Sequence, residues 1–266
     1  MIRSTLLPVT WILSVVLPVA AIASEPIQIR VVSYNIHHGE GTDRKLDLKR
    51  IADTIAAAKP DIVVLQEVDQ NTSRTGKVDQ AATLAEMLKM NSVFGGNLKL
   101  QGGQYGNAIL TRYPSISMTN HRLPQVNPGE PRGVIEADIR VPGMQPSLKV
   151  LATHLDHRPH NADRIASCEA INKLTKDWGD RPALLAGDLN DVPESKALQI
   201  LALHWAQANA EPVATIPSDD PERQIDFILL RPASQWKVVE FQVLDEAVAS
   251  DHLAILAVLE WTGSSE

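Results

Sequence analysis

Hydrophobic positions in the first third of the chain follow two spacings, one typical of buried strands and one typical of helices. The segment 29–36 is typical of a strand, and the short apolar run at 61–66 has the pattern of a buried strand. Between them, apolar residues recur at helical spacing after Asp47, a residue type that caps helix N-termini, until Lys59-Pro60 ends the helix. The pattern therefore predicts strand, helix and strand in succession.

The rest of the chain continues this alternation without a low-complexity linker. Further strands are predicted near 92–97, 107–111, 115–122, 133–141, 148–154, 183–187, 224–230, 238–244 and 253–260, with helices near 80–89, 162–178 and 194–204. Longer loops are expected near 70–79, 98–106, 122–132, 156–161 and 206–223. Many strands with few helices predict one α/β (α+β) domain, in which helices cover stacked sheets.

The N-terminal segment differs from this domain. Arg3 precedes an apolar run over 6–22, and Ala21-Ile22-Ala23 has the small-x-small pattern of a cleavage site. We predict a signal peptide over 1–23, a domain over 24–266, and a secreted or periplasmic protein. The alternative is an uncleaved membrane anchor, which the short run and its two prolines disfavour. No other stretch is apolar enough to cross a bilayer.

Composition narrows the range of partners. The 266 residues are 44% hydrophobic and 21% charged, which is typical of a globular protein with a substantial core. Without residues 1–23 the chain loses one arginine and no acidic residue, so its formal charge changes from −7 to −8. This charge does not attract long polyanions, and three Phe and three Tyr offer few platforms for stacking bases. The single cysteine, Cys168, excludes an intrachain disulfide and is expected to be a small buried apolar side chain.

Side chains that bind metal ions or transfer protons gather at the ends of the predicted strands. They are Asn35, His37, Glu67, His154, Asp188, Asn190, Asp226, Asp251 and His252, with Asp226 near the entrance of its strand and Asp251-His252 opening the last strand. Asp188, Asn35 and His154 each have a simpler explanation when taken alone, as a helix cap or turn residue, a turn residue and a half-buried histidine. Glu67 is harder to explain in this way, because an unpaired charge at the end of so apolar a strand is costly. Their recurrence at the same kind of position favours one shared pocket.

The residue types in this set suit two kinds of chemistry. Hard divalent cations such as Mg²⁺ prefer carboxylate and amide oxygens, which Glu67, Asn35 and Asp251 offer. A histidine beside a carboxylate is oriented and kept basic, which fits His252 with Asp226. Zn²⁺ favours more His or Cys ligands at closer spacing, so we rank it below Mg²⁺ or Mn²⁺.

A set of motifs resembles the endonuclease/exonuclease/phosphatase superfamily, which has the DNase-I-like fold. The matching segments are Tyr34-Asn35, Leu65–Glu67, Gly106–Pro114, Thr153–Asp156, Gly187–Asn190, Ile225–Leu229 and Ser250–His252, in the family order and across essentially the whole mature chain. The resemblance implies a four-layer αββα sandwich of two packed mixed β-sheets flanked by helices. It also implies a secreted, bacterial-type, metal-dependent hydrolase of phosphoesters.

The resemblance also implies a metal site. Glu67 would be the principal ligand, helped by Asn35 and Asp251, and the cation would be Mg²⁺, with Mn²⁺ as an alternative. His37 departs from the family pattern, because some nuclease relatives carry an acidic residue at this position. Whether it ligates a metal is therefore open, and it could instead bind the scissile phosphate or a second cation.

The catalytic residues implied by the resemblance come from the second half of the chain. Asp188 and Asn190 would position or deprotonate the attacking water. His252, oriented by Asp226, would act on the phosphate or relay a proton, and His154 would contact the phosphate or protonate the leaving oxygen.

Two further residues are assigned supporting roles. Asn107 would support the site by hydrogen bonds. Arg132 is either a phosphate contact or an ordinary surface arginine.

These observations predict a monomeric metal-dependent phosphoesterase. The first hypothesis is a phosphodiesterase that hydrolyses a compact phosphoester by in-line attack of water. The substrate would be a lipid head group, an inositol-type phosphate or a short nucleotide. The alternative enzyme is an extracellular Mg²⁺-dependent nuclease, for which long nucleic acid is an allowed but not favoured substrate. A catalytically inactive binding module of the same fold ranks last, because no residue expected to act chemically is missing.

Overall fold

Two six-stranded mixed sheets pack face to face in the computed structural model, which describes residues 26–263 apart from the side chain of Ile116. The first sheet has the order β11 (Trp236–Val243), β12 (Ile255–Trp261), β1 (Ile27–Asn35), β2 (Ile62–Gln70), β4 (Gly103–Thr111) and β3 (Asn91–Leu100). The second has the order β5 (Ser115–Arg122), β6 (Gly133–Ile139), β7 (Leu148–His154), β8 (Ala183–Asp188), β10 (Asp226–Arg231) and β9 (Ala206–Gln207). The predicted signal peptide at 1–23 lies outside the described residues.

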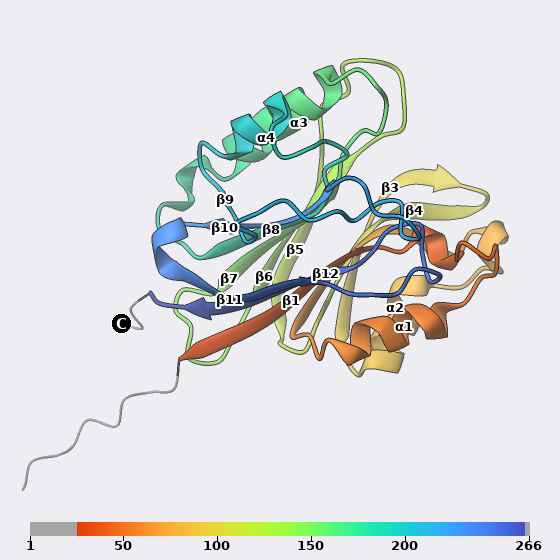
Figure 1. Cartoon of the computed structure of the whole chain (residues 1–266), viewed down its shortest axis with the longest axis horizontal. Coiled ribbons are helices and arrows are strands. Elements are labelled where there is room, and N and C mark those ends of the chain that lie inside the picture. Colours follow the sequence, from red (N-terminus) through yellow and green to blue (C-terminus); the bar gives the residue numbers. More distant parts are fainter. Residues whose placement is uncertain (1–25, 264–266) are drawn as a thin grey trace, which may run out of the picture.

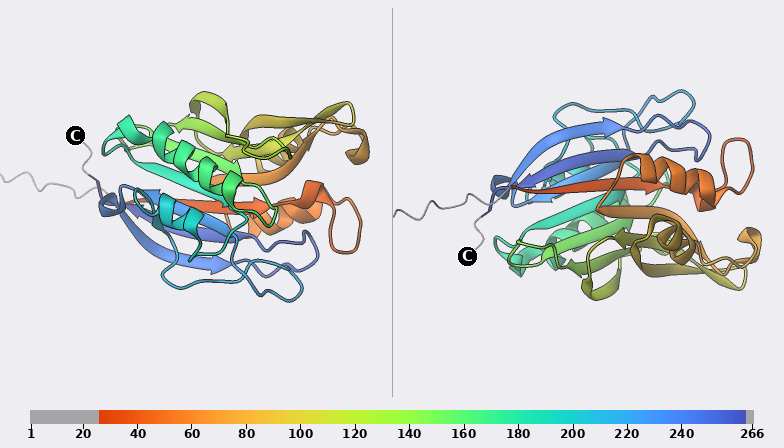
Figure 2. Two further views of the ribbon diagram at one scale, coloured as in Figure 1. Left: turned by 90° about the horizontal axis from the view of Figure 1, so that it is seen from above. Right: turned by 90° about the horizontal axis from the view of Figure 1, so that it is seen from below.

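Helices cover the outer face of each sheet (Figure 1). Helices α1 (Leu48–Ala57) and α2 (Gln80–Leu88) cover the first sheet, whereas α3 (Ala162–Leu174) and α4 (Lys196–Leu201) cover the second, as the views from below and above show (Figure 2). Short 3₁₀ turns occur at His37–Gly39 (η1), Ser73–Thr75 (η2), Lys176–Trp178 (η3) and Ala233–Gln235 (η4). The predicted four-layer αββα sandwich is confirmed. Among the described residues, no helix has the length and apolarity needed to span a membrane.

Local sequence explains where the helices begin. The Asp47 side chain accepts a hydrogen bond of 3.0 Å from the backbone N–H of Arg50, so it caps α1 as predicted. Ile51 and Ile55 then lie on the buried face of α1, and both are fully buried against the first sheet. The helix is therefore held by its apolar stripe, with the cap fixing its first turn.

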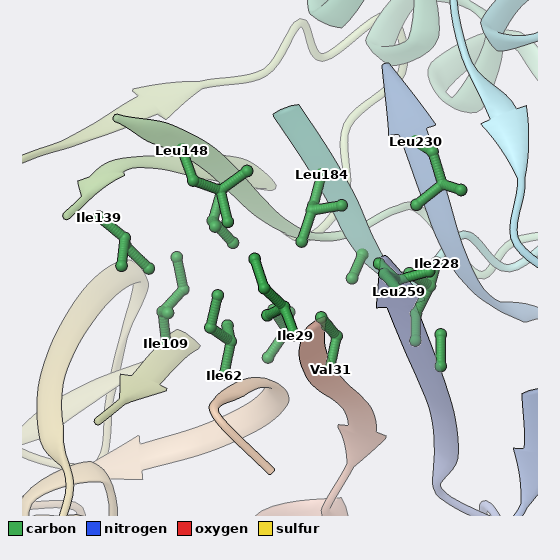
Figure 3. Packing of buried hydrophobic residues seen from close by; sticks show 14 of the residues in the cluster. Ile29, Val31, Ile62, Ile109, Ile139, Leu148, Leu184, Ile228, Leu230 and Leu259 are labelled. Carbon is green, nitrogen blue, oxygen red and sulfur yellow. The ribbon is translucent and has the colours of Figure 1, made fainter. Parts of the chain in front are cut away.

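The inner faces of the two sheets form the central core. Aliphatic side chains from both sheets fill the space between them; those in Figure 3 are Ile29, Val31, Ile62, Ile109, Ile139, Leu148, Leu184, Ile228, Leu230 and Leu259. Burial of this apolar surface is the main force that fixes one sheet against the other. The relative placement of the two sheets matters for function, because each contributes half of the site.

A parallel strand pair near the middle of each sheet brings the predicted polar residues to one edge. In the first sheet β1 runs parallel to β2, and Asn35 is the partner of Gln66. In the second sheet β7 runs parallel to β8, and His154 is the partner of Asp188. Asp226, at the start of the antiparallel strand β10, is also paired with Asp188.

Three expectations about element boundaries were wrong. The predicted loop near 98–106 is a hairpin, because β3 and β4 continue to Leu100 and Gly103 and turn through Gln101-Gly102, both with positive φ. The predicted helix at 162–178 ends at Leu174 and is followed by the separate turn η3. Strand β12 begins only at Ile255, so Ser250–His252 form a bend before the strand instead of opening it.

The central core predicts a large difference between two leucines. Leu184 is fully buried between the sheets, whereas Leu203 is 73% exposed. Leu184→Ala should lower the free energy of unfolding by about 2–5 kcal/mol, because it leaves a cavity. The matched change Leu203→Ala should alter it by no more than about 0.5 kcal/mol. Denaturant unfolding of both variants measures this, and equal losses would contradict the assignment of the core.

Candidate active site

Glu67 occupies a bulge in β2, so the strand continues past it instead of ending there as predicted. The pairing of β2 with β4 shifts between Leu65 and Val68, and Glu67 itself has a φ of 58°. A bulge places an extra residue in one strand and turns its side chain out of the regular alternation. The half-buried Glu67 carboxylate is thereby directed toward Asn35 at the end of β1.

The Asn35 side chain joins the two sheets. Its Nδ2 donates to Glu67 Oε1 (3.2 Å) in the first sheet and to Asp188 Oδ2 (3.1 Å) in the second. Its Oδ1 accepts a hydrogen bond of 3.1 Å from the backbone N–H of His37, and this donor fixes which end of the amide is oxygen. The amide oxygen keeps a second lone pair, so Asn35 bridges the two sheets while its predicted role as a metal ligand stays a prediction.

Asp226 and His252 form the oriented pair predicted from the sequence. His252 Nδ1 lies 2.9 Å from Asp226 Oδ2, and the same oxygen accepts a hydrogen bond of 2.6 Å from the Thr215 hydroxyl. The other ring nitrogen, Nε2, lies 3.7 Å from Asp188 Oδ2 and 3.4 Å from Asn35 Nδ2. The imidazole is therefore held with one ring nitrogen on Asp226 and the other near Asp188 and Asn35.

The surroundings of this pair shift its proton affinities. Burial alone would lower the pKa of His252, but the hydrogen bond and negative charge of Asp226, together with the charge of Asp188, raise it to about 10. Burial and the charge of Asp226 raise the pKa of Asp188 to about 7. In the absence of a cation, His252 is thus a stable imidazolium beside a carboxyl that titrates near neutrality.

A second imidazole, that of His154, also lies beside Asp188. Its Nε2 is 3.4 Å from Asp188 Oδ2, while its Nδ1 is buried without a hydrogen-bond partner among the described residues. Burial, followed by the positive charges of Arg132 and His252, lowers the pKa of His154 well below 6.5. The site therefore contains one charged and one neutral imidazole near the same carboxyl oxygen.

The turn after β8 depends on Gly187. A Cβ at this position would lie 1.9 Å from the carbonyl oxygen of Thr153, so only glycine permits the close approach of β7 and β8. After it, the Asn190 backbone N–H donates to Asp188 Oδ1 (2.9 Å), and its side-chain amide donates to the Leu155 carbonyl (3.1 Å). The Gly187–Asn190 motif thus fixes both polar side chains against the end of β7.

The structure places the remaining predicted residues around this centre. Asn107 is buried and donates to the Gly133 carbonyl (3.3 Å), a hydrogen bond of the supporting kind that was predicted. Arg132 is not a surface residue: it is 7% exposed and pairs with Glu130 at 2.8 Å. Asp251 is half-buried, and its carboxylate accepts a hydrogen bond of 3.3 Å from Ser250.

Two groups of side chains within residues 26–263 have the spacing of a metal site. The first group is Asp188, Asp226 and His252, and the second is His37, His38 and Glu67. In each group the potential ligand atoms all lie within 4.8 Å of one another. Asp251, a predicted ligand, belongs to neither group. In the first group the His252 imidazolium offsets one of the two negative charges, whereas in the second the Glu67 carboxylate lies near two imidazoles.

The sequence analysis overlooked three residues at this site. Thr215 lies in a long irregular loop, and nothing in the local pattern indicates that its hydroxyl contacts Asp226. Ser250 donates to the Asn35 carbonyl (2.7 Å), although its motif had been used only for its two neighbours. His38 was not among the predicted residues, although two adjacent histidines in the sequence are a visible signal of a nitrogen-rich site.

Known proteins resemble this chain in sequence and in fold. The chain matches the Endonuclease/Exonuclease/phosphatase family over residues 32–252. The chain belongs to this family. It is therefore a hydrolase acting on phosphoester bonds, as predicted.

Individual relatives support the family assignment. The uncharacterized protein YbhP of Escherichia coli strain K12 is 27% identical over 88% of this chain and 97% of its own length. The endonuclease/exonuclease/phosphatase from Beutenbergia cavernae superimposes with a TM-score of 0.75 and 26% identity, over 89% of this chain and 72% of that one. The mannosyl-6-phosphatase Bt3783 of Bacteroides thetaiotaomicron shares the fold, with a TM-score of 0.69 and 19% identity over 87% and 99% of the two chains.

Enzymes of the endonuclease/exonuclease/phosphatase family use divalent metal ions, and the residues present here fit such an ion. Glu67 presents a half-buried carboxylate within 4.8 Å of two ring nitrogens, and His38 Nδ1 is buried with no hydrogen-bond partner in the described part of the chain. A cation at this carboxylate would satisfy groups that the protein alone leaves unpaired.

The Asp226–His252 pair predicts a pH-dependent signal in metal-free protein. The His252 imidazole should remain protonated at pH 8, where His154 is neutral, and Asp226→Asn should lower the pKa of His252. Because the folded-state pKa is raised from 6.5 to about 10, this proton stabilises the fold fully below pH 6.5, and the contribution is lost as pH rises through 10.

Nuclear magnetic resonance titration of the ring nitrogens measures both imidazoles, with His154 as the internal reference. An unchanged His252 titration in the Asp226→Asn variant would show that this carboxylate does not hold the proton.

Proposed function

We propose that the protein is a metal-dependent phosphodiesterase that acts on a compact phosphoester by in-line attack of water. The observation that carries this proposal is the Asn35 amide, which links Glu67 of one sheet to Asp188 of the other and lies 3.4 Å from His252. One buried amide thus donates to the two carboxylates, and the His252 imidazole expected of such an enzyme lies beside it. A fold that served only for binding would not need this convergence of titratable groups.

The residues divide the chemistry among them. Asp188, whose pKa burial raises to about 7, is the group that accepts the proton of the attacking water, and Asn190 holds its other oxygen through the backbone N–H. The His252 imidazolium neutralises negative charge that grows on the phosphoryl oxygens. His154, whose Nε2 lies 3.4 Å from Asp188 Oδ2, contacts the phosphate or the leaving oxygen.

Glu67 would hold the divalent cation, and Asp251 is retained as a predicted second ligand. When bound, the cation supplies positive charge that polarises the phosphoryl group. Mg²⁺ is the ion predicted from the sequence, with Mn²⁺ as the alternative.

A compact substrate is favoured by the charge pairing around the pocket. Four arginines near the strand ends are already bound to acidic side chains: Arg74 to Asp69 (2.7 Å), Arg132 to Glu130 (2.8 Å), Arg158 to Asp156 (2.8 Å) and Arg164 to Asp191 (3.0 Å). Tight binding of a long polyanion requires cations that are free to contact many phosphates. A chain with a formal charge of −7 and its nearby arginines paired fits a lipid head group, an inositol-type phosphate or a short nucleotide better.

The alternative enzyme is a nuclease, because the family name includes endonucleases and exonucleases. A substrate panel separates the two: a generic aryl phosphodiester, lipid phosphodiesters, inositol phosphates, short nucleotides, RNA and plasmid DNA, each with and without a chelator. We expect hydrolysis of a compact substrate that the chelator abolishes. Glu67→Gln should lower kcat by at least about a hundredfold, since a primary electrostatic contact of the reaction is lost.

The control is Glu240→Gln, which changes an exposed glutamate on β11 and should leave the rate unchanged. Rapid nicking of plasmid DNA with slow turnover of every compact substrate would favour the nuclease. Full activity in the chelator, or in Glu67→Gln, would reject metal-dependent hydrolysis at this site.

A further inference from the structure

Two histidines lie directly beside the carboxylate that is expected to hold the cation. A ring nitrogen of His37, a ring nitrogen of His38 and a carboxylate oxygen of Glu67 all lie within 4.8 Å of one another. The two rings meet edge to face, with centroids 4.6 Å apart. Any cation on Glu67 therefore lies within reach of nitrogen donors as well as oxygen donors.

The hydrogen bond of His37 leaves its other nitrogen free to bind a metal ion. His37 Nδ1 lies 3.0 Å from the Glu40 carbonyl oxygen, which can only accept, so Nδ1 carries the proton and Nε2 has a free lone pair. A metal-binding histidine commonly donates its second N–H to a carbonyl or carboxylate, which fixes the ring. His37 has this arrangement.

His38 offers a second ring nitrogen that has no hydrogen-bond partner among the described residues. Its Nδ1 is buried and has no hydrogen-bond partner within residues 26–263, while its Nε2 lies 3.8 Å from Glu40 Oε2. A buried ring nitrogen without a partner is unfavourable unless a ligand or ion satisfies it.

The backbone around the two histidines is held in place by its own hydrogen bonds. His37 and His38 have φ values of 42° and 44°, a region that non-glycine residues rarely adopt. The turn is closed by Gly39 N–H to the Ile36 carbonyl (2.7 Å), and Gln80 Nε2 donates to the His38 carbonyl (2.7 Å). The rings are therefore positioned before any ion binds.

We propose that the Glu67 site takes a first-row divalent transition metal ion, such as Mn²⁺, Co²⁺ or Zn²⁺, in preference to Mg²⁺, with His37 and His38 as nitrogen ligands. Mg²⁺ binds oxygen donors and retains its waters, whereas imidazole suits the transition metals. The sequence ranking of Zn²⁺ below Mg²⁺ depended on a lack of closely spaced histidines, and the His37–His38 pair removes that reason. This inference rests on the proposed function, because it names the cation of the same site.

Metal binding to the full chain tests the proposal without an activity assay. Calorimetric titration of metal-free protein should show Mn²⁺ and Co²⁺ binding at least about tenfold more tightly than Mg²⁺. Replacing both histidines, with His37→Asn and His38→Asn, should remove this preference. His37→Asp alone should move the preference toward Mg²⁺, because it restores an oxygen donor. The control is His204→Asn, an exposed histidine remote in sequence from the turn, which should bind as the wild type does.

A spectroscopic measurement on the wild-type protein tests the nitrogen ligands without any variant, so it does not depend on whether a variant folds. Pulsed electron paramagnetic resonance of the Mn²⁺-loaded protein should show coupling to imidazole nitrogen. Absence of nitrogen coupling, or equal affinity for Mg²⁺ and Mn²⁺, would overturn the transition-metal assignment while leaving metal-dependent hydrolysis at Glu67 intact. The proposed function itself would fail on a different result, namely hydrolysis that persists in Glu67→Gln.

Discussion

The candidate active site depends on one buried side-chain amide, that of Asn35, which donates hydrogen bonds to two carboxyl groups. Asn35 Nδ2 donates both of its hydrogens, one to Glu67 and one to Asp188, and these residues belong to different sheets. Carboxylates brought together at low exposure repel each other unless donors or cations lie between them. The geometry persists only if the sheets pack in one fixed relation, and the aliphatic layer between them provides this.

Several residues at this site have a strained backbone conformation. Four non-glycine residues in or next to the site, Glu67, His37, His38 and Asn190, have positive φ values. Conformations of this kind cost of order 1–3 kcal/mol each and persist only where surrounding structure enforces them. Here the enforcement comes from the β2 bulge, from the Gln80 contact with His38 and from the Asn190 hydrogen bonds. Strain that is offset by the core thus positions side chains that regular strands would direct elsewhere.

Local patterns in the sequence predicted the strands and helices better than they predicted the contacts between residues of different sheets and loops. Apolar runs and the Asp47 cap located most strands and the first helix, because these depend on neighbours in sequence. The hairpin at Gln101-Gly102 was missed because its strands are rich in polar residues. Among the site residues, the grouping at strand ends was apparent from the chain, but the bridging role of Asn35 and the hydroxyl of Thr215 arise from tertiary packing that no local pattern encodes. The His37–His38 pair was visible, yet its significance required the nearby Glu67 carboxylate.

The central claim is that Glu67 holds one divalent cation beside a phosphorus centre on which Asp188 and His252 act, with the Asn35 amide linking Glu67 to Asp188. A crystal structure of the protein with Mn²⁺ and inorganic phosphate tests it most directly, because anomalous scattering locates the ion independently of the model of the protein. The account predicts Mn²⁺ on the Glu67 carboxylate and phosphate between that ion and the imidazoles of His154 and His252. A cation bound elsewhere, or Glu67 and Asp188 no longer sharing the Asn35 amide, would contradict it.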